Sequence, residues 1–223
     1  MNRANPARSR SEESMTTITV LGSGNVARAL TGRLRDAGHE VIVGSRAPDA
    51  VAADFGVRVA GLREAAKSAE VVINALPGGV SVEVLTGLAA ELSGKVLVDI
   101  ANATESDAYG FASALFYPGS SLAEEIQRAL PDVRVVKALN TMHSSVMADP
   151  ALLAVSPTAF LSGDDADAKK VVGGLLAELG WVPEWIIDLG GVETARGPEA
   201  FLLMVGGLVR ALGPVPFAMA IAH

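Results

Sequence analysis

The chain has 223 residues, of which half are hydrophobic, and its 18 basic and 25 acidic residues give a formal net charge of −7. This acidic balance argues against a nucleic acid or an anionic membrane surface as a partner. The absence of cysteine excludes disulfides, thiol catalysis and cysteine-based metal sites, and three scattered histidines argue against a histidine-rich metal site.

The chain begins with a polar segment, residues 1–15, that lacks the apolar core of a secretory signal, and we expect it to be a disordered tail. After it, strand patterns alternate with helical patterns, which predicts a Rossmann-type, doubly wound α/β fold with a parallel sheet. The expected strands are residues 17–21, 40–44, 57–59, 70–75, 95–99, 133–138 and 158–162. The expected helices are residues 25–37, 48–54, 61–68, 80–92, 120–130 and 164–179.

A glycine-rich turn follows the first expected strand, where Gly22, Gly24 and Ala27 have the spacing G-x-G-x-x-A. Gly22 allows a sharp turn, Gly24 lets the backbone approach a pyrophosphate, and Ala27 lets the next helix pack close to the sheet. The free N–H groups and the dipole at the start of helix 25–37 would attract the same anion. Because a strand precedes the motif and a helix follows it, the motif predicts a dinucleotide site.

Ser45 and Arg46 follow the second expected strand, where sites that prefer NAD place an acidic residue on the ribose 2′-hydroxyl. A hydroxyl and a guanidinium at this point can instead bind a 2′-phosphate. We therefore predict NADP(H) as the cofactor. The alternative is that Arg46 is an ordinary surface arginine.

Three loops at the expected carboxyl ends of strands contain Asn74, Asn102 and Asn140. Ligands of open α/β sheets bind at this edge, so the amides are candidates to border a nicotinamide and its redox partner. Asparagine also caps turns, and both interpretations stay open for each residue. His143 has no acidic neighbour in the sequence and fits a structural histidine better than a proton donor, so we assign no catalytic residue and no metal ligand.

The end of the chain changes character, with a loop expected at residues 188–191 and a long apolar helix at residues 192–213. The longest apolar stretch, residues 201–209, is too short to cross a bilayer, so we expect a soluble, cytoplasmic protein. We expect the helix to contribute core and a pocket wall, and contact with a second subunit would make a homodimer. We assign residues 16–140 to an NADP-binding domain and residues 141–223 to a small C-terminal region for substrate binding or dimerisation, packed on the sheet edge.

A family resemblance covers much of the chain. Between residues 17 and 197 the chain contains, in order, LGSGNVARAL, AGHEVIVGSR, ALPGG, KVLVDIAN, VVKALNTM, FLSGDDADAKKVV and DLGGVETAR. With these segments it resembles the NADPH-dependent reductases of the 5-deazaflavin coenzyme F420, and it is similar to the cytosolic reductase domain of membrane metalloreductases. The resemblance implies direct hydride transfer between nicotinamide C4 and a deazaflavin or flavin-like ring, with no acid–base side chain.

The resemblance also implies roles for individual residues. The pyrophosphate would be held by Gly22, Ser23, Gly24, Asn25 and Val26, and the 2′-phosphate by Ser45 and Arg46. The nicotinamide would be bordered by Leu76, Pro77, Ala101 and Asn102, and the deazaflavin by Asn140, Thr141 and Met142. The archaeal members have His in place of Asn140, so two alternatives stay open: an NADPH-dependent reductase of a small carbonyl or imine, and a non-catalytic NADP(H) sensor.

Overall fold

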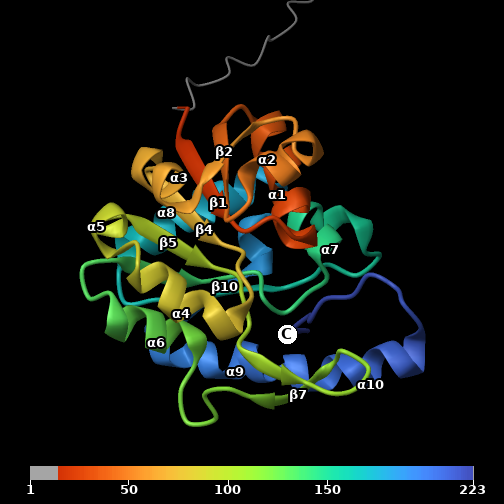
Figure 1. Ribbon diagram of the computed structural model, residues 1–223. Coiled ribbons are helices and arrows are strands. Elements are labelled where there is room, and N and C mark those ends of the chain that lie inside the picture. The colour runs from red at the N-terminus through yellow and green to blue at the C-terminus, as the bar shows by residue number, and fades with distance from the viewer. Residues whose placement is uncertain (1–14, 223) are drawn as a thin grey trace, which may run out of the picture.

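The structure, a computed structural model, describes residues 15–222, and a sheet of eight strands runs through the centre of this range (Figure 1). Its strands are β1 (Thr17–Leu21), β2 (Glu40–Ser45), β3 (Arg58–Gly61), β4 (Val71–Asn74), β5 (Val96–Asp99), β8 (Arg134–Lys137), β9 (Ala159–Ser162) and β10 (Ile186–Gly190). The order across the sheet is β10-β9-β8-β5-β4-β1-β2-β3. Its last six members follow the Rossmann order 3-2-1-4-5-6, which confirms the predicted fold.

The sheet is mostly parallel. The six neighbouring strands β8, β5, β4, β1, β2 and β3 all pair in parallel. In contrast, β9 pairs antiparallel with β8, and β10 pairs in parallel with β9. The final two strands therefore run opposite to the other six. They also lie beyond residue 140, so the sheet continues into the range expected to form the C-terminal region.

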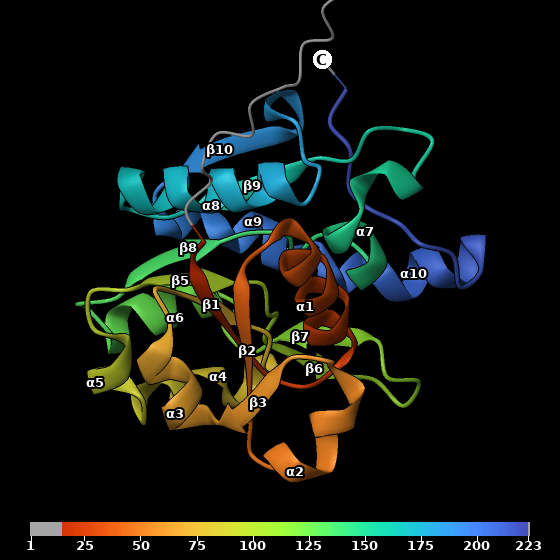
Figure 2. The same cartoon turned by 90° about the horizontal axis from the view of Figure 1, so that it is seen from above.

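Two hydrophobic cores lie on opposite faces of the sheet because successive strand residues point to opposite sides. Val20 and Ile73 belong to one core, and their chain neighbours Leu21 and Val72 belong to the other. The first core is covered by α1 (Asn25–Ala37) and α8 (Ala166–Glu178), and the second by α3 (Leu62–Ser68), α4 (Gly78–Thr86), α5 (Ala89–Leu92) and α6 (Leu122–Ala129). Figure 2 shows α1 on one side of β1 and β2 and α3 on the other.

Some predicted elements differ from those in the structure. The expected helix 80–92 is divided into α4 and α5, and the expected helix 48–54 forms α2 (Pro48–Val51) and the 3₁₀ turn η1 (Ala52–Asp54). The prediction of a loop at residues 188–191 is wrong, because residues up to Gly190 form the edge strand β10. An edge strand pairs on one side only, so it tolerates exposed polar and glycine residues that otherwise suggest a loop.

The hairpin of β6 (Thr104–Ser106) and β7 (Ala112–Leu115) was not predicted, nor was α7 (Ser144–Ala148). Shorter 3₁₀ turns lie at η2 (Pro150–Leu152) and η3 (Pro183–Trp185). The expected helix 192–213 forms as the successive elements η4 (Val192–Ala195), α9 (Arg196–Ala200) and α10 (Leu202–Leu212). Figure 1 shows β7 beside α10 at the margin of the molecule, where a Cβ on Gly206 would lie only 2.9 Å from Phe111.

After α10 the chain returns to the sheet edge. Residues 214–222, the C-terminal segment, cross the loop that follows β8: the N–H of His143 donates to Phe217 O at 2.8 Å, and the N–H of Met219 donates to Thr141 O at 3.2 Å. Of the predicted tail, residues 1–14 lie outside the described residues. Between residues 15 and 222, none of the helices has the length and apolarity that a membrane crossing needs.

Candidate active site at the carboxyl edge of the sheet

Two neighbouring cavities lie at the carboxyl ends of the parallel strands. The first has a volume of about 460 Å³ and the second about 520 Å³, and both are lined by Ala75, Leu76 and Pro77 of the loop after β4. β1 stands between β2 and β4 in the sheet, so this is the point at which the strand order reverses. Open α/β sheets bind their ligands at such a point.

The first cavity collects the predicted residues of the glycine-rich turn and of the end of β2. It is lined by Gly22, Ser23, Gly24, Gly44, Ser45, Arg46, Ala47, Val51, Leu62, Ala75, Leu76 and Pro77. Gly22 has a φ of +121°, and a Cβ there would overlap the carbonyl of Ala75, so only glycine fits. A Cβ on Gly24 would meet no atom within 4 Å, which leaves the backbone open to a ligand.

The start of α1 is free to bind an anion. Its N-cap residue Gly24 offers no side-chain cap, and the first turn holds no acidic residue. The N–H groups of this 13-residue helix and its dipole therefore favour a phosphate in the first cavity. Among the residues that the structure describes, no carboxylate lines this cavity.

Ser45 and Arg46 offer donors at the far side of the first cavity. Ser45 is buried, and its Oγ accepts from the N–H of Ala47 at 3.2 Å, so its hydroxyl proton remains available to a ligand. The exposed side chain of Arg46 makes no ion pair within the described range and is the only charged side chain that lines this cavity. This pair of donors suits a dianionic group such as a 2′-phosphate.

The second cavity collects most of the other predicted residues. Asn25, Val26, Leu76, Pro77, Ala101, Asn102, Asn140 and Met142 all line it. Asn25 and Val26, expected at the pyrophosphate, thus line the second cavity and not the first. Thr141 is buried and lines neither cavity.

An apolar wall from the end of the chain closes the second cavity. Leu202, Val205 and Val209 of α10 form part of this wall, as expected for the long apolar helix. Phe111 of the hairpin and Phe217 of the C-terminal segment complete it, and the sequence analysis did not identify them. No local sequence motif marks either residue, since each reaches the cavity only because distant segments of the chain pack together. Within residues 15–222, no Asp, Glu, Lys or Arg lines this cavity.

His143 lines the second cavity and also caps a helix. Its Nδ1 accepts from the N–H of Ser145 at 3.3 Å and lies 2.9 Å from Ser145 Oγ, at the start of α7. An Nδ1 that accepts places the proton of a neutral ring on Nε2. The capping contact agrees with the structural interpretation of this histidine.

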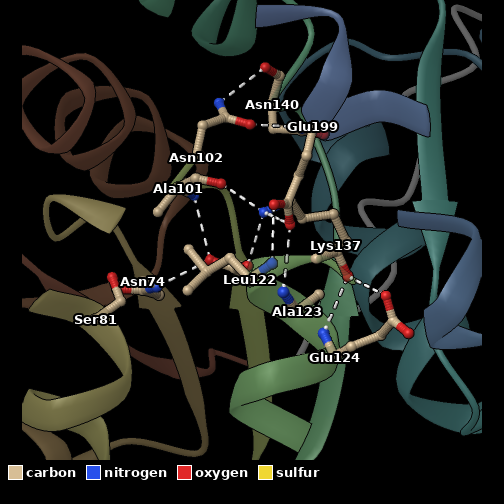
Figure 3. A network of polar contacts seen from close by, with 12 residues as sticks. Asn74, Ser81, Ala101, Asn102, Leu122, Ala123, Glu124, Lys137, Asn140 and Glu199 are labelled. Carbon is tan, nitrogen blue, oxygen red and sulfur yellow. Dashed lines mark hydrogen bonds and ion pairs between the residues drawn. The ribbon is translucent and has the colours of Figure 1, made fainter. Parts of the chain in front are cut away.

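A buried ion network lies directly beneath the second cavity. Asn74, Asp99 and Lys137 are the last residues of β4, β5 and β8, and they stand in register across the sheet. Residues in register on parallel strands point to the same face, which brings the three side chains together. Lys137 Nζ lies 2.8 Å from Asp99 Oδ2 and 2.8 Å from Glu199 Oε1 of α9, and it also donates to Ala101 O (Figure 3).

The network composed of Asp99, Lys137 and Glu199, here called the edge network, is almost fully buried, with Lys137 only 1% exposed. Burial alone would lower the pKa of Lys137, but the two paired carboxylates outweigh it and raise the pKa, so the ammonium stays charged. This network was not predicted from the sequence. The feature that could have indicated it is a polar residue at the end of each of three largely apolar strands, VVIN, VLVD and RVVK.

Side-chain amides extend the edge network to neighbouring loops. Asn74 Nδ2 donates to Asp99 Oδ1 at 2.8 Å, and Asn74 Oδ1 accepts from the N–H of Leu76 at 3.3 Å. Asn140 Nδ2 donates to Asn102 Oδ1 at 2.9 Å, and Asn102 Nδ2 donates to Asn140 O at 3.2 Å. The loops after β4, β5 and β8 are therefore tied to one another.

Comparison with known proteins gives a consistent relationship. The family model for coenzyme F420-dependent NADP oxidoreductases matches residues 17–103. The F420-dependent NADP reductase of Methanothermobacter marburgensis is 34% identical over 196 residues, which cover 80% of this chain and 86% of that protein. A solved protein of Arthrobacter sp. FB24, provisionally assigned as an F420-dependent NADP reductase, is 41% identical with a TM-score of 0.86, over 93% of this chain and 100% of that one.

A second group of relatives is longer. The metalloreductase STEAP3 of Rattus norvegicus is 33% identical over 189 residues, which cover 83% of this chain but 36% of that protein. The chain thus spans little more than a third of this relative's length. The matches to the archaeal reductase and to the Arthrobacter protein cover at least 80% of both chains in each comparison. On this similarity the chain belongs to the F420-dependent NADP oxidoreductases, a family of NADP-dependent enzymes.

Proposed function

We propose that this protein transfers a hydride between NADP(H) and a deazaflavin of the F420 type. The observation that carries the proposal is the pair of cavities that share the loop 75–77. In the described part of the chain, Arg46 is the only charged residue that lines the first cavity, which suits the phosphates of NADP(H), and no charged residue lines the second, which suits two neutral rings. A cofactor that crosses the shared loop would place its nicotinamide beside the acceptor.

The first cavity would hold the adenosine half of the cofactor. The backbone at Gly24 and the start of α1 would bind the pyrophosphate, and Ser45 and Arg46 would bind the 2′-phosphate. The nicotinamide would lie against Pro77 and Ala101 at the boundary with the second cavity. The cofactor supplies the hydride from C4 of this ring when it is bound.

The second cavity would hold the acceptor ring. Its apolar wall on α10 suits a flat ring, and the amides of Asn102 and Asn140 could orient the ring's polar edge. Direct hydride transfer needs no acid or base, so the protein contributes alignment and exclusion of water. A flavin presents a similar ring and is the second candidate acceptor.

We also propose that the protein is a homodimer. Leu203, Met204 and Leu212 project from α10 and are more than 40% exposed, although they belong to a strongly apolar helix. A second copy of the same face would cover them. The cytoplasmic location expected from the sequence stays a prediction, as does the role of residues 141–223 as a separate substrate region.

The function is tested by following NADPH oxidation with F420, FMN, FAD and a panel of carbonyls and imines, with NADH as the control for cofactor choice. Turnover with F420 that exceeds turnover with the flavins supports the proposal, and the reverse order supports the second candidate. Turnover confined to carbonyls or imines would contradict both. Tight NADPH binding without turnover of any acceptor would identify an NADP(H) sensor instead.

A further inference from the structure

We propose that Lys137 and Glu199 are positioning residues for the reaction, because through them the edge network holds two parts of the wall of the second cavity, at Ala101 and on α10, in a fixed relation. The inference rests on the proposed function of the two cavities. Neither residue lines a cavity, so neither would touch the cofactor or the acceptor. Both would act through the residues that do.

One wall is held by Lys137 through Ala101. The carbonyl of Ala101 accepts from Lys137 Nζ, and its N–H donates to Asp99 Oδ1 at 3.2 Å, so both backbone polar groups of this cavity-lining residue are fixed by the network. The backbone of the next residue, Asn102, packs closely against Gly78, because a Cβ on Gly78 would overlap the Asn102 carbonyl. A shift of Ala101 would therefore also displace the loop that leads into α4.

The wall formed by α10 is held by Glu199. This residue lies on α9, three positions before α10, whose residues Leu202, Val205 and Val209 line the cavity. Besides Lys137, its carboxylate accepts from the N–H groups of Leu122 at 2.8 Å and Ala123 at 3.3 Å at the start of α6 (Figure 3). Glu199 thus fixes the point from which α10 extends over the cavity.

The exposure of α10 makes this anchor important. Within the described range, Gly206 is the only residue of α10 that is fully buried, so the core does little to fix the helix. Both parts of the cavity wall are therefore held through contacts to one ammonium group, that of Lys137. Burying three charged groups requires costly desolvation and is weak evidence for stability alone, whereas their directional contacts define positions.

The test compares Lys137→Met and Glu199→Gln with a matched control, Lys169→Met. Lys169 makes the same type of contacts, 2.8 Å from Asp188 and 3.2 Å from Gly190 O. Its partners lie on β10, and no residue of that strand is among the described residues that line either cavity. Binding of NADPH and of adenosine 2′,5′-bisphosphate, which lacks the nicotinamide, is measured by titration. The kcat and KM for the acceptor are measured with the F420 or flavin that the wild-type protein turns over.

We expect both network variants to bind the adenosine fragment within about twofold of wild type, to bind NADPH several-fold more weakly, and to lose about 10- to 100-fold in kcat. The control should match wild type in all three values. Variants that lower the melting temperature but keep wild-type NADPH binding and kcat would overturn the proposal and leave the network a structural role only. Glu199→Gln keeps the size of the side chain, so it serves if Lys137→Met does not fold.

The same experiment separates this inference from the proposed function. If wild-type protein turns over no acceptor, the proposed function fails, while the comparison of NADPH with the adenosine fragment still tests the network. If wild-type protein is active and the variants equal it, the network inference fails alone. A uniform loss of fragment and NADPH binding would also count against it, because the network would then support the fold as a whole.

Discussion

The guanidinium of Arg46 is exposed at the end of β2, and no carboxylate of the described residues lines the cavity that it borders. A charged donor without a protein partner retains its full capacity to bind an anionic ligand. Ser45 beside it is buried and held by the N–H of Ala47, which fixes the direction in which its own hydroxyl can donate. At the scale of single residues, these two side chains would determine which dinucleotide the protein prefers.

We predict that Arg46→Glu weakens NADPH binding by about 10- to 100-fold, because it removes a charge-assisted bond and adds repulsion of the 2′-phosphate. NADH, which lacks this phosphate, should bind almost as before. Dissociation constants from fluorescence titration measure both effects. Arg58→Glu is a suitable control, since Arg58 is an exposed arginine outside both cavities. An equal loss for NADPH and NADH would show that Arg46 does not recognise the phosphate.

At the scale of elements, the start of α6 connects the sheet to the end of the chain. Ser121 caps this helix: its Oγ accepts from the N–H of Glu124 at 3.1 Å and donates to the Glu124 carboxylate at 2.9 Å. Arg196 of α9 donates to both carboxylate oxygens of Glu124: its Nε lies 2.8 Å from Oε2, and its Nη2 lies 2.5 Å from Oε1. The contact helps to secure α9, and with it Glu199, against α6.

This contact predicts a pH dependence. The hydrogen bonds from Arg196 are the main reason that the pKa of Glu124 lies below its ordinary value, and they outweigh the opposing effect of burial. A lowered pKa in the folded state adds stability above the ordinary value of 4.5, and this contribution is lost as the pH falls through the folded-state pKa.

Arg196→Met should therefore lower the melting temperature at neutral pH, and the gap to wild type should narrow below a pH of about 4.5. Thermal unfolding followed by circular dichroism over a series of pH values measures this gap. Arg58→Met, which breaks an ion pair between two exposed side chains, should show little effect at any pH. A gap that stays constant down to acid pH would rule out the ionised pair as its source.

The elements that the sequence predicted well are those with a clear local pattern. β1 and α1 have the predicted bounds because apolar runs and a helical period leave few alternatives, and the glycine turn between them has a fixed backbone geometry. β10 and the β6–β7 hairpin lack such patterns, because they are edge or isolated strands whose residues are partly exposed. Their pairing depends on distant partners that local sequence does not reveal.

At the scale of the whole molecule, the first cavity depends on local sequence patterns, and the second depends on contacts between distant segments. More than half of the residues that line the first cavity lie in two short runs at the ends of β1 and β2, so spacing alone located Gly24 and Arg46. The second depends on the long-range contacts of the C-terminal segment, including the bridge between Met142 and Ala218 that brings Phe217 to the cavity. Nothing in the local sequence around Phe217 specifies that return.

The proposed homodimer is the prediction that belongs to the whole molecule. Met204 and Leu212 on α10 are 57% and 61% exposed, and contact between two copies would remove this apolar surface from water. We expect light scattering after size exclusion to give twice the chain mass of 22.9 kDa for wild type. Met204→Glu should shift the mass toward that of the monomer, because pairing would bury an unpartnered carboxylate.

Val171→Glu provides the matched control, since Val171 is a 41% exposed aliphatic residue on α8 and not on the α10 face. It should leave the mass unchanged. A wild-type protein that runs as a monomer at micromolar concentration would contradict the proposed dimer. So would a Met204→Glu variant that keeps the doubled mass, because the interface would then have to lie on another face.

Dimer formation through α10 would also restrain the helix that lines the second cavity. In the monomeric variant, the KM for the acceptor should therefore rise above its wild-type value by a larger factor than the KM for NADPH.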